Sequence, residues 1–338
     1  MIIRPGAPSD QQAFSEIKCA AWRKAYAHIL PASILDGLDS QDFGKQWTVM
    51  MDDHHAHVAE IDGLVVGYAT LGPNRYPDHP PKFELWSLYV HPDFAGKGVG
   101  FNLVQHMSGI ALWHGSAGMI IASFEQNHAA RKFYSERCAG RLVGSGTYPI
   151  DEVDYPDVVY QVDADFDSLE AGSALTVTQA AEQTDFPAIT DFLHRCYERN
   201  AAAGLRFNAT HQTPETTQRR LLAGEGLLVN LSGRLAATVT LESPDKECYG
   251  TFCPNEPYCE LTQFAVAPEL RQLGLGRWIE QRLCRRAREL DRSWIALDTA
   301  VEATGLITLY QSWGYEVVGE IDYRPGTNYL SVVMAKKV

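Results

Sequence analysis

The stretch CELTQFAVAPELRQLGLG, residues Cys259–Gly276, indicates how this chain folds. It repeats, with substitutions, the stretch FELWSLYVHPDFAGKGVG at Phe83–Gly100. A glutamate, a valine, a proline and two glycines recur at one constant offset, the offset that separates Glu84 from Glu260. A single repeat of this length predicts two copies of one domain rather than a solenoid, whose periods are shorter.

Both copies show the same predicted order of elements. A short strand and a helix come first, then two strands joined by a tight turn, and then the strand that carries the glutamate. A glycine loop follows, with an amphipathic helix predicted over 101–113 in the first copy and 277–290 in the second. A strand, a further helix and a hairpin close each copy. The order predicts an α+β domain built on a mixed sheet.

The stretch DADFDSLEAGSA, residues 163–174, is acidic and rich in small residues. It shows neither a helical nor a strand period, which is typical of an interdomain linker. The predicted organisation is a first domain over 1–163, a linker over 164–173 and a second domain over 174–338.

Length and composition agree with two globular domains. A chain of 338 residues is too long for one ordinary core, and 45% apolar with 21% charged residues is typical of a soluble protein. No apolar run approaches the roughly 18 residues that span a bilayer, and the N-terminal MIIRPG lacks a signal-peptide pattern, so we expect no membrane partner and a cytoplasmic location. The formal charge of −13 disfavours nucleic acid and suits a cationic amine.

Cysteines and histidines give no metal-site pattern. Seven cysteines in a long chain favour reduced thiols over a disulfide framework. Cys248, Cys253 and Cys259 do not have the spacing of a common zinc site. His54, His55 and His57 lie in a polar stretch that is interpreted as a solvated loop. We therefore expect no metal.

The glycine loops point to an anion. Gly98 and Gly100, like Gly274 and Gly276, lie between a predicted strand and a predicted helix. Glycine lets the backbone approach a bulky ligand, and the start of the helix offers free N–H groups and the positive end of its dipole. The spacing fits neither the dinucleotide fingerprint nor the P-loop. One such loop would indicate a turn, whereas two at equivalent junctions favour binding of a pyrophosphate.

The pattern [RQ]xxGxG after a strand of the type E-L-x-x-x-x-V-x-P resembles the acyl-CoA loop of the GCN5-related N-acetyltransferases. The resemblance covers nearly the whole chain, twice. Arg271–Gly276 matches the loop fully, whereas Ala95 replaces the first Arg or Gln in the other copy. It implies two tandem GNAT-like domains, each a mixed, mostly antiparallel sheet flanked by helices, with acetyl-CoA as the acyl donor.

The resemblance also implies that the loop, the strand before it and Asn127 contact CoA. The cationic side chains among the residues below are candidates for the CoA phosphates because of their charge, and their alternative is an ordinary surface charge. In the first copy the predicted CoA residues are Leu88, Tyr89, Val90, Ala95, Gly96, Lys97, Gly98, Val99, Gly100, Asn127 and Arg131. In the second copy they are Phe264, Ala265, Val266, Arg271, Gln272, Leu273, Gly274, Leu275, Gly276 and Arg277. The full loop match favours the second copy for CoA, while Asn127, which Ala303 replaces in the second copy, favours the first.

Glu84 and Glu260 are the candidate bases. An alkyl ammonium has a pKa of about 10.4 and must lose a proton before it attacks a thioester, and a carboxylate, acting directly or through water, can accept that proton. The resemblance places Tyr134 and Tyr310 where a phenol faces the CoA sulfur and donates to the leaving thiolate. The alternatives are an ordinary surface or ion-paired glutamate, and a tyrosine that only packs in the core.

The resemblance places acceptors over the helical region of Trp22 and Tyr26, whose alternative role is packing. It implies an N-acetyltransferase that moves acetyl from acetyl-CoA to a primary amine of a small molecule. An acyl-CoA-binding regulatory protein with one or both domains silent, a transferase for longer acyl groups and a first domain that only braces the second stay open. The sequence predicts no oligomeric state.

Overall fold

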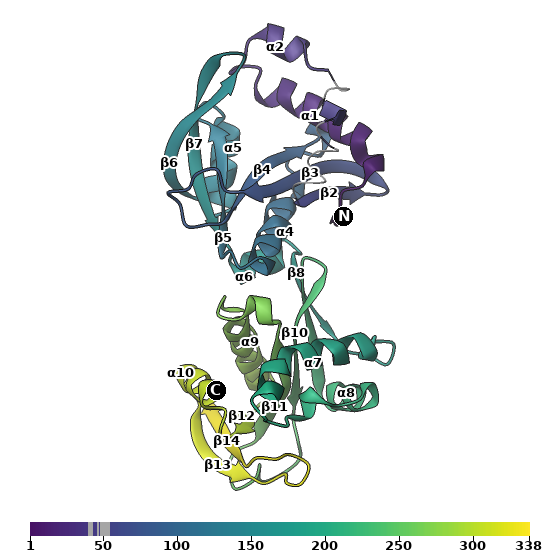
Figure 1. Cartoon of the computed structure of the whole chain (residues 1–338), viewed down its shortest axis with the longest axis vertical. Helices are drawn as coiled ribbons and strands as arrows, with labels where there is room; N and C mark the ends of the chain where they lie inside the picture. Colours follow the sequence, from purple (N-terminus) through teal and green to yellow (C-terminus); the bar gives the residue numbers. More distant parts are fainter. Residues whose placement is uncertain (40–42, 46, 48–54) are drawn as a thin grey trace. The chain divides into compact units, whose positions relative to one another are not determined.

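Two compact units make up the chain, Met1–Leu175 and Thr176–Val338. The computed structural model describes residues 1–39, 43–45, 47 and 55–338. Each unit contains one seven-stranded sheet that carries helices (Figure 1). The α+β class and the presence of one mixed sheet in each copy are confirmed.

The sheet of the first unit has the order β1-β2-β3-β4-β5-β7-β6. Its described strand pairs are antiparallel apart from β4 with β5. The elements of this unit are β1 (Ile2–Pro5), α1 (Gln11–Ala25), α2 (Ala32–Asp36), β2 (His55–Ile61), β3 (Leu64–Pro73), β4 (Phe83–Val90), α4 (Val99–Trp113), β5 (Gly118–Phe124), α5 (His128–Lys132), the π-helical turn η3 (Phe133–Arg137), β6 (Arg141–Ile150), β7 (Val153–Asp163) and α6 (Phe166–Ala171).

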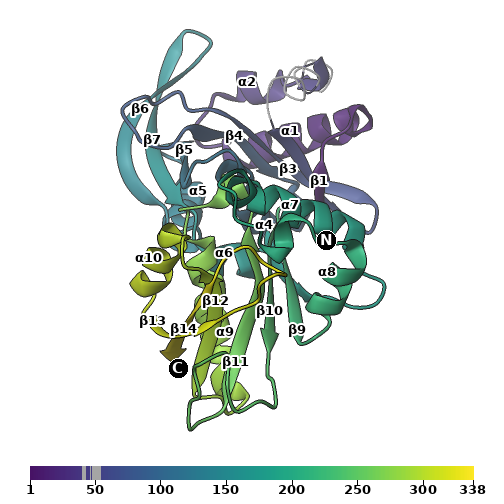
Figure 2. The ribbon, with the colours of Figure 1, turned by 60° about the horizontal axis from the view of Figure 1, so that its bottom comes forward.

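The second unit repeats this topology in the order β8-β9-β10-β11-β12-β14-β13, with β11 and β12 as its parallel pair. Figure 2 shows α8 at the β9 end of this sheet and α10 at the β13 end. The elements are β8 (Leu175–Gln179), α7 (Phe186–Ala202), α8 (Pro214–Leu221), β9 (Glu225–Leu231), β10 (Arg234–Glu242), β11 (Tyr258–Val266), α9 (Leu275–Glu289), β12 (Trp294–Ala300), α10 (Thr304–Ser312), β13 (Glu316–Ile321) and β14 (Ser331–Lys337).

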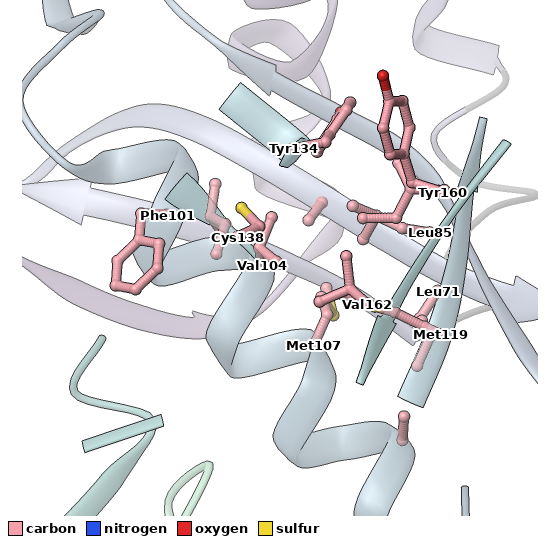
Figure 3. Close-up of a cluster of buried hydrophobic side chains, with 14 of the residues drawn as sticks. Leu71, Leu85, Phe101, Val104, Met107, Met119, Tyr134, Cys138, Tyr160 and Val162 are labelled. Carbon is pink, nitrogen blue, oxygen red and sulfur yellow. The ribbon is translucent and has the colours of Figure 1, made fainter. Parts of the chain in front are cut away.

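The core of the first unit lies between α4 and its sheet. In Figure 1, α1 and α4 lie on opposite sides of β3 and β4, and both helices contact these strands. Val104 and Met107 of α4 pack against the sheet residues Leu85, Met119 and Val162 (Figure 3). Burying a side chain of this size contributes about 1.5–3 kcal/mol. This packing fixes the start of α4, and with it the glycine loop, against the end of β4.

The stretch predicted as an irregular linker contains a helix, α6, and lies in the first unit. Asp165 caps the helix by accepting a hydrogen bond from the Ser168 amide, and Leu169 is fully buried. A Cβ at Gly172 would lie 2.5 Å from Gln105 of α4, so this segment packs closely on that helix. A helix of six residues is too short to show a hydrophobic period, which is why the sequence did not reveal it.

The interpretation of the histidine stretch as a solvated loop is wrong for the residues that the structure describes. His55 and His57 lie in β2, and His57 is only 8% exposed. The His57 ring packs on the His106 ring of α4 with 4.7 Å between centroids. Burial lowers the pKa of His57 to about 3 and that of His106 to about 4. His54 lies outside the described residues.

The expectation that all cysteines are reduced thiols is also wrong, because Cys248 and Cys253 form a disulfide. Tyr249 and Phe252 exchange backbone hydrogen bonds of 2.8 and 3.1 Å, and this tight turn brings the flanking sulfur atoms together. The other five cysteines are free and buried. Within the described part of the chain, no group of three or more His, Cys, Asp or Glu side chains could hold a metal ion. No helix in that part is both long and apolar enough to cross a membrane.

Candidate active sites

In both units the central parallel strands separate directly after the glutamate. Parallel pairing of β4 with β5 ends at Glu84 opposite Ile120, and pairing of β11 with β12 ends at Glu260 opposite Ala296. The register is therefore the same in the two copies. Beyond these residues the two strands open into a wedge. A wedge inside a sheet leaves backbone groups available to a ligand, because each strand has lost a neighbour.

The two glycine loops share one backbone conformation. Gly96 and Gly98 have φ values of +76° and +84°, and Gln272 and Gly274, at the same offset, have +64° and +96°. Gly98 and Gly274 are the N-cap residues of α4 and α9. This left-handed conformation favours glycine. The amides of the first helical turn have no intrahelical acceptor, so each loop presents N–H groups that can bind an anion.

A cavity of about 1050 Å³ in the first unit joins this loop to the wedge. It extends past α5 and η3 to α1, so loop, wedge and helix line one continuous space. The predicted site residues that line it are Tyr26, Leu88, Tyr89, Val90, Ala95, Gly96, Gly98, Gly100, Asn127 and Tyr134.

Other predicted residues of this copy make contacts elsewhere. Lys97 lies over the Phe94 ring at 4.7 Å. Arg131 donates from Nη1 to the Glu125 carbonyl at 3.0 Å. Val99 is buried in the core, and Trp22 packs edge-on against Tyr26. Arg137, which the sequence did not indicate, lines the cavity, with its guanidinium 4.2 Å from the Phe101 ring.

Tyr134 and Asn127 lie in this cavity for identifiable structural reasons. Tyr134 belongs to η3 and is largely buried, and burial raises the pKa of its phenol, which keeps it protonated. The side-chain oxygen of Asn127 caps α5 by accepting a hydrogen bond from the Ala130 amide at 3.1 Å. Ala303, at the equivalent N-cap of α10, cannot make this bond.

Glu84 is bound by Arg75. The Arg75 side chain donates from Nε to Oε2 at 2.9 Å and from Nη2 to Oε1 at 2.5 Å, and the Arg75 amide donates to Oε2 at 3.1 Å. The carboxylate is 1% exposed. Charge-assisted pairs of this two-pronged type are among the strongest hydrogen bonds in proteins. In this structure Glu84 is therefore an ion-paired glutamate, which is the alternative to its role as a base.

A second cavity, of about 220 Å³, lies in the second unit at the opening of β11 and β12. Glu260, Phe264 and Tyr310 line it together. Residues 271–276 are not among its lining residues. The cavity therefore covers the wedge and the region beyond Glu260, but not the glycine loop.

Glu260 differs from Glu84 in its surroundings. It is 6% exposed, and its Oε1 atom has no hydrogen-bond partner among the residues that the structure describes. Burial is the main cause that raises the pKa of this carboxyl group. A buried carboxylate without a cation bound to it is a better proton acceptor than one held by arginine. Tyr310 lines the same cavity, and burial raises the pKa of its phenol.

The cationic side chains of the second loop bond within their own unit. Arg271 donates to the Val266 carbonyl at 3.4 Å and to the Cys196 carbonyl of α7. Arg277 donates to the buried Glu280 at 3.0 Å and to the Trp313 carbonyl at 3.2 Å. A Cβ at Gly276 would lie 3.3 Å from the Trp313 ring, so this indole packs closely on the first turn of α9.

Besides Arg137, the sequence analysis missed four residues of these sites: Arg75, Arg220, Tyr249 and Asp298. Tyr249 donates to Asp298 Oδ1 at 2.5 Å, and both line the second cavity together with Arg220. The repeat could not reveal Asp298, because Ala122 stands at the matching position. The sequence feature that could have indicated Asp298 is its position as a carboxylate at the end of the apolar strand sequence SWIALD.

Known proteins resemble this chain in both halves. The model of the acetyltransferase (GNAT) family matches residues 19–140 and 186–315, together more than half of the chain. The uncharacterized N-acetyltransferase YuaI of Bacillus subtilis is 25% identical over 125 residues, which are 37% of this chain and 72% of that protein. The L-amino acid N-acyltransferase MnaT of Escherichia coli is 37% identical over 73 residues, which are 22% of this chain and 42% of that protein.

Among solved structures, the PaiA N-acetyltransferase of Thermoplasma acidophilum in complex with coenzyme A is similar, with 18% identity and a TM-score of 0.38. The match covers 48% of this chain and 98% of that one. The family match falls on both copies of the repeat and includes Glu84 and Glu260 with their glycine loops. This chain therefore belongs to the acetyltransferase (GNAT) family and carries two of its domains in tandem.

Proposed function

We propose that this chain moves an acetyl group from acetyl-CoA to the primary amine of a small molecule, and that the transfer takes place in the second unit. The proposal depends above all on one observation: Glu260 and Tyr310 line the same cavity at the point where β11 and β12 separate. An acceptor and a donor of protons thus face one space that opens between two strands. The acidic chain, with its charge of −13, favours a cationic acceptor.

Each residue has a defined role in this reaction. Glu260, directly or through a water molecule, takes a proton from the substrate ammonium. The freed amine attacks the thioester carbonyl carbon, and a backbone N–H within Phe264–Val266 stabilises the oxyanion. The C–S bond then breaks, and the Tyr310 phenol gives its proton to the departing CoA thiolate. The extra proton on the attacking nitrogen passes to the resulting phenolate, directly or through water, which leaves a neutral amide and restores Tyr310.

The raised pKa of Glu260 suits this role. At pH 7, keeping an amine with a pKa of about 10.4 neutral costs roughly 4–5 kcal/mol. A base is most effective when its pKa lies near the working pH, because it is then mostly ionised and still binds a proton well. Burial without an arginine partner moves Glu260 in that direction.

The cavity of the first unit supports a second candidate function for that unit, in which it binds acetyl-CoA but carries out no base-assisted transfer. Its cavity includes the glycine loop, the wedge and Tyr134, which together suit a pyrophosphate, an extended arm and a thioester. Arg75 neutralises the carboxylate that would serve as a base there. The cavity suited to acetyl-CoA thus lies in the first unit and the base without an arginine partner lies in the second, whereas a single-domain transferase has both in one domain.

Calorimetric titration of the full chain with CoA, combined with thiol release from acetyl-CoA across a panel of small amines, tests the proposal. We expect CoA to bind and at least one amine to raise thiol release above hydrolysis. Tyr310→Phe should lower the amine-dependent rate at least tenfold with CoA affinity little changed.

Two results would overturn the assignment. An absence of CoA binding, or of any amine-dependent release, removes the transferase proposal. A loss of rate in Tyr134→Phe but not in Tyr310→Phe moves the reaction to the first unit. The exposed Tyr148→Phe serves as a control for a lost phenol.

A further inference from the structure

The cavity of the second unit has charges of both signs on its wall. Glu260 of β11 and Asp298 of β12 supply two carboxylates, and Arg220 of α8 supplies a guanidinium. The remaining wall is rich in aromatic rings. A cavity with both a negative and a positive pole suits a ligand that carries both charges.

The negative pole has unused hydrogen-bonding capacity. Glu260 Oε1 is buried with no partner within the described residues. Asp298 accepts a hydrogen bond from Tyr249 through Oδ1. Burial is the main cause that raises the pKa of Glu260, the charge of Lys246 and the Tyr258 hydroxyl lower it, and Glu242 and Asp298 raise it further. Glu260 and Asp298 line one cavity and so face a common space. An ammonium between them would relieve their repulsion and supply the missing donors.

The positive pole is held in place by buried amides. Arg220 donates from Nη1 to the side-chain oxygens of Gln212 at 3.0 Å and Gln263 at 3.3 Å. Gln212 is itself fixed by donating to Thr217 at 2.7 Å. Both partners of the guanidinium are neutral, so these bonds orient Arg220 without cancelling its charge. A guanidinium in a fixed orientation is suited to a carboxylate.

Tyrosine phenols lie in the field of both poles. Burial raises the pKa of Tyr197 and of Tyr323 to about 12, and it also raises the pKa of Tyr329. In each case Asp298 raises the pKa further and Arg220 lowers it. The three rings therefore lie close to both charges. Tyr329 packs on Phe207 with 4.9 Å between centroids, which extends the aromatic wall.

We propose that this cavity binds a free α-amino acid with an apolar or aromatic side chain. The ammonium lies between Glu260 and Asp298, the carboxylate meets Arg220, and the side chain packs on the tyrosine rings. The volume of about 220 Å³ is below the roughly 300 Å³ at which pockets for drug-sized ligands begin, which favours a small amino acid over an aminoglycoside or a bulky polyamine. That the bound amine is also the acetyl acceptor rests on the proposed function.

Simpler ligands match the wall less well. An amine without a carboxylate leaves Arg220 without a counter-charge. A diamine brings a second cation toward Arg220, and a carboxylic acid without an amine faces two carboxylates. Each mismatch loses a charged interaction inside a partly enclosed cavity, where such interactions are stronger than in bulk water.

Calorimetry on the full chain without acetyl-CoA tests the binding by itself. L-Phenylalanine, L-leucine and L-methionine are each compared with the amine that lacks the carboxylate and with the acid that lacks the amine. We expect at least one amino acid to bind ten or more times as tightly as both of its partial analogues. The inference is overturned if no amino acid binds more tightly than its matching amine.

Substitutions at Arg220 and at Asp298 test the positive pole and the negative pole separately. Arg220→Gln should remove the preference for the amino acid over its amine while amine binding remains, and Arg220→Lys should restore part of it. Asp298→Asn should weaken the amino acid and the amine alike. Arg219→Gln, an exposed arginine on the same helix, is the matched control and should leave both affinities unchanged. Equal affinities in Arg220→Gln and the unaltered chain would contradict the assignment.

The outcomes distinguish this inference from the proposed transfer. If an amino acid binds with the expected preference but no amine or amino acid raises thiol release from acetyl-CoA, the site stands and the proposed acetylation fails. If amines are acetylated and no amino acid shows the preference, the transfer stands and this inference fails.

Discussion

Arg75 and Glu84 form a two-pronged ion pair in the first unit, at the place where Glu260 lies without a cation bound to it in the second. The two glutamates occupy the same register in equivalent strands. Their chemistry differs because an arginine side chain reaches one carboxylate and not the other. The two domains therefore carry a glutamate at the same position, but its electrostatic environment differs between them.

Arg75→Met should lower the free energy of unfolding of the first unit by about 1–3 kcal/mol, because it leaves a buried carboxylate without its donors. We place the effect at the low end of that range, since the Arg75 side chain is 48% exposed and solvent screens its charge. Urea denaturation measures the change. Adding Glu84→Gln to Arg75→Met should recover part of the loss, and no recovery would argue against the pairing as its cause.

Glu260→Gln should lower kcat for amine acetylation by about 10²–10⁴-fold, the range expected for loss of a general base. Glu84→Gln should change kcat less than twofold, because its carboxylate is already held by Arg75. In the unaltered chain, kcat should rise with pH and then level off once Glu260 is ionised. That rising limb should disappear in Glu260→Gln. If the limb persists in the variant, another group is the base.

The pair His57 and His106 should make the first unit sensitive to acid. Their pKa values of about 3 and 4 in the fold lie below the roughly 6.5 of an unfolded histidine. The unfolded chain therefore binds more protons, and stability is complete above about pH 6.5 and falls as the pH drops toward 4. The slope is at most about 1.4 kcal/mol per pH unit for each ring.

Chemical denaturation between pH 7 and 4.5 measures this effect. Replacing both rings by glutamine should flatten the dependence on pH. The exposed His128→Gln is the matched control, and it should leave the slope unchanged. A slope that is identical in the double variant and the unaltered chain would assign acid sensitivity to other groups.

Reduction of the disulfide between Cys248 and Cys253 should raise the KM for the amine several-fold with little change in kcat. Tyr249 lies inside the ring that this bond closes, and its hydroxyl binds Asp298 in the cavity wall. Opening the ring frees the turn and loosens this hydrogen bond. Steady-state kinetics with and without a thiol reductant measure the effect. In the variant with both cysteines changed to serine, the KM for the amine should be the same with and without the reductant. A difference in that variant would show that the reductant acts elsewhere.

Most of the fold could be predicted from the sequence, because the internal repeat and the hydrophobic periodicity indicate the same helices and strands. The helices predicted over 101–113 and 277–290 are α4 and α9 with slightly shifted ends. Short helices were missed: α8, which follows α7, and α6, which has no period to read. The six residues of α6 form a helix because Asp165 caps it and Leu169 is buried on α4.

The candidate sites were predicted less completely, because a site depends on where side chains from distant segments meet. The loops and the two glutamates follow from local pattern and repetition. The contact of Arg75 with Glu84 does not, since the two residues are nine positions apart in the sequence and only the folded hairpin of β3 and β4 brings them together. Asp298 and Arg220 break the symmetry of the repeat, so comparing the copies could not indicate them.

The wedge between β4 and β5 has a consequence for the dynamics of the sheet. Among the described residues, parallel pairing there is limited to Phe83 with Met119 and Glu84 with Ile120, whereas β4 stays paired with β3 along its other edge, so only those later amides of β4 that point away from β3 face the wedge. An extended ligand arm lying in the wedge would act as a surrogate strand. Deuterium uptake by the amides within 85–90 that point away from β3 should accordingly be fast in the free protein and slow when the arm is bound, whereas the amides paired with β3 should exchange slowly in both states. The wedge edge of this strand thus reports whether the site is occupied.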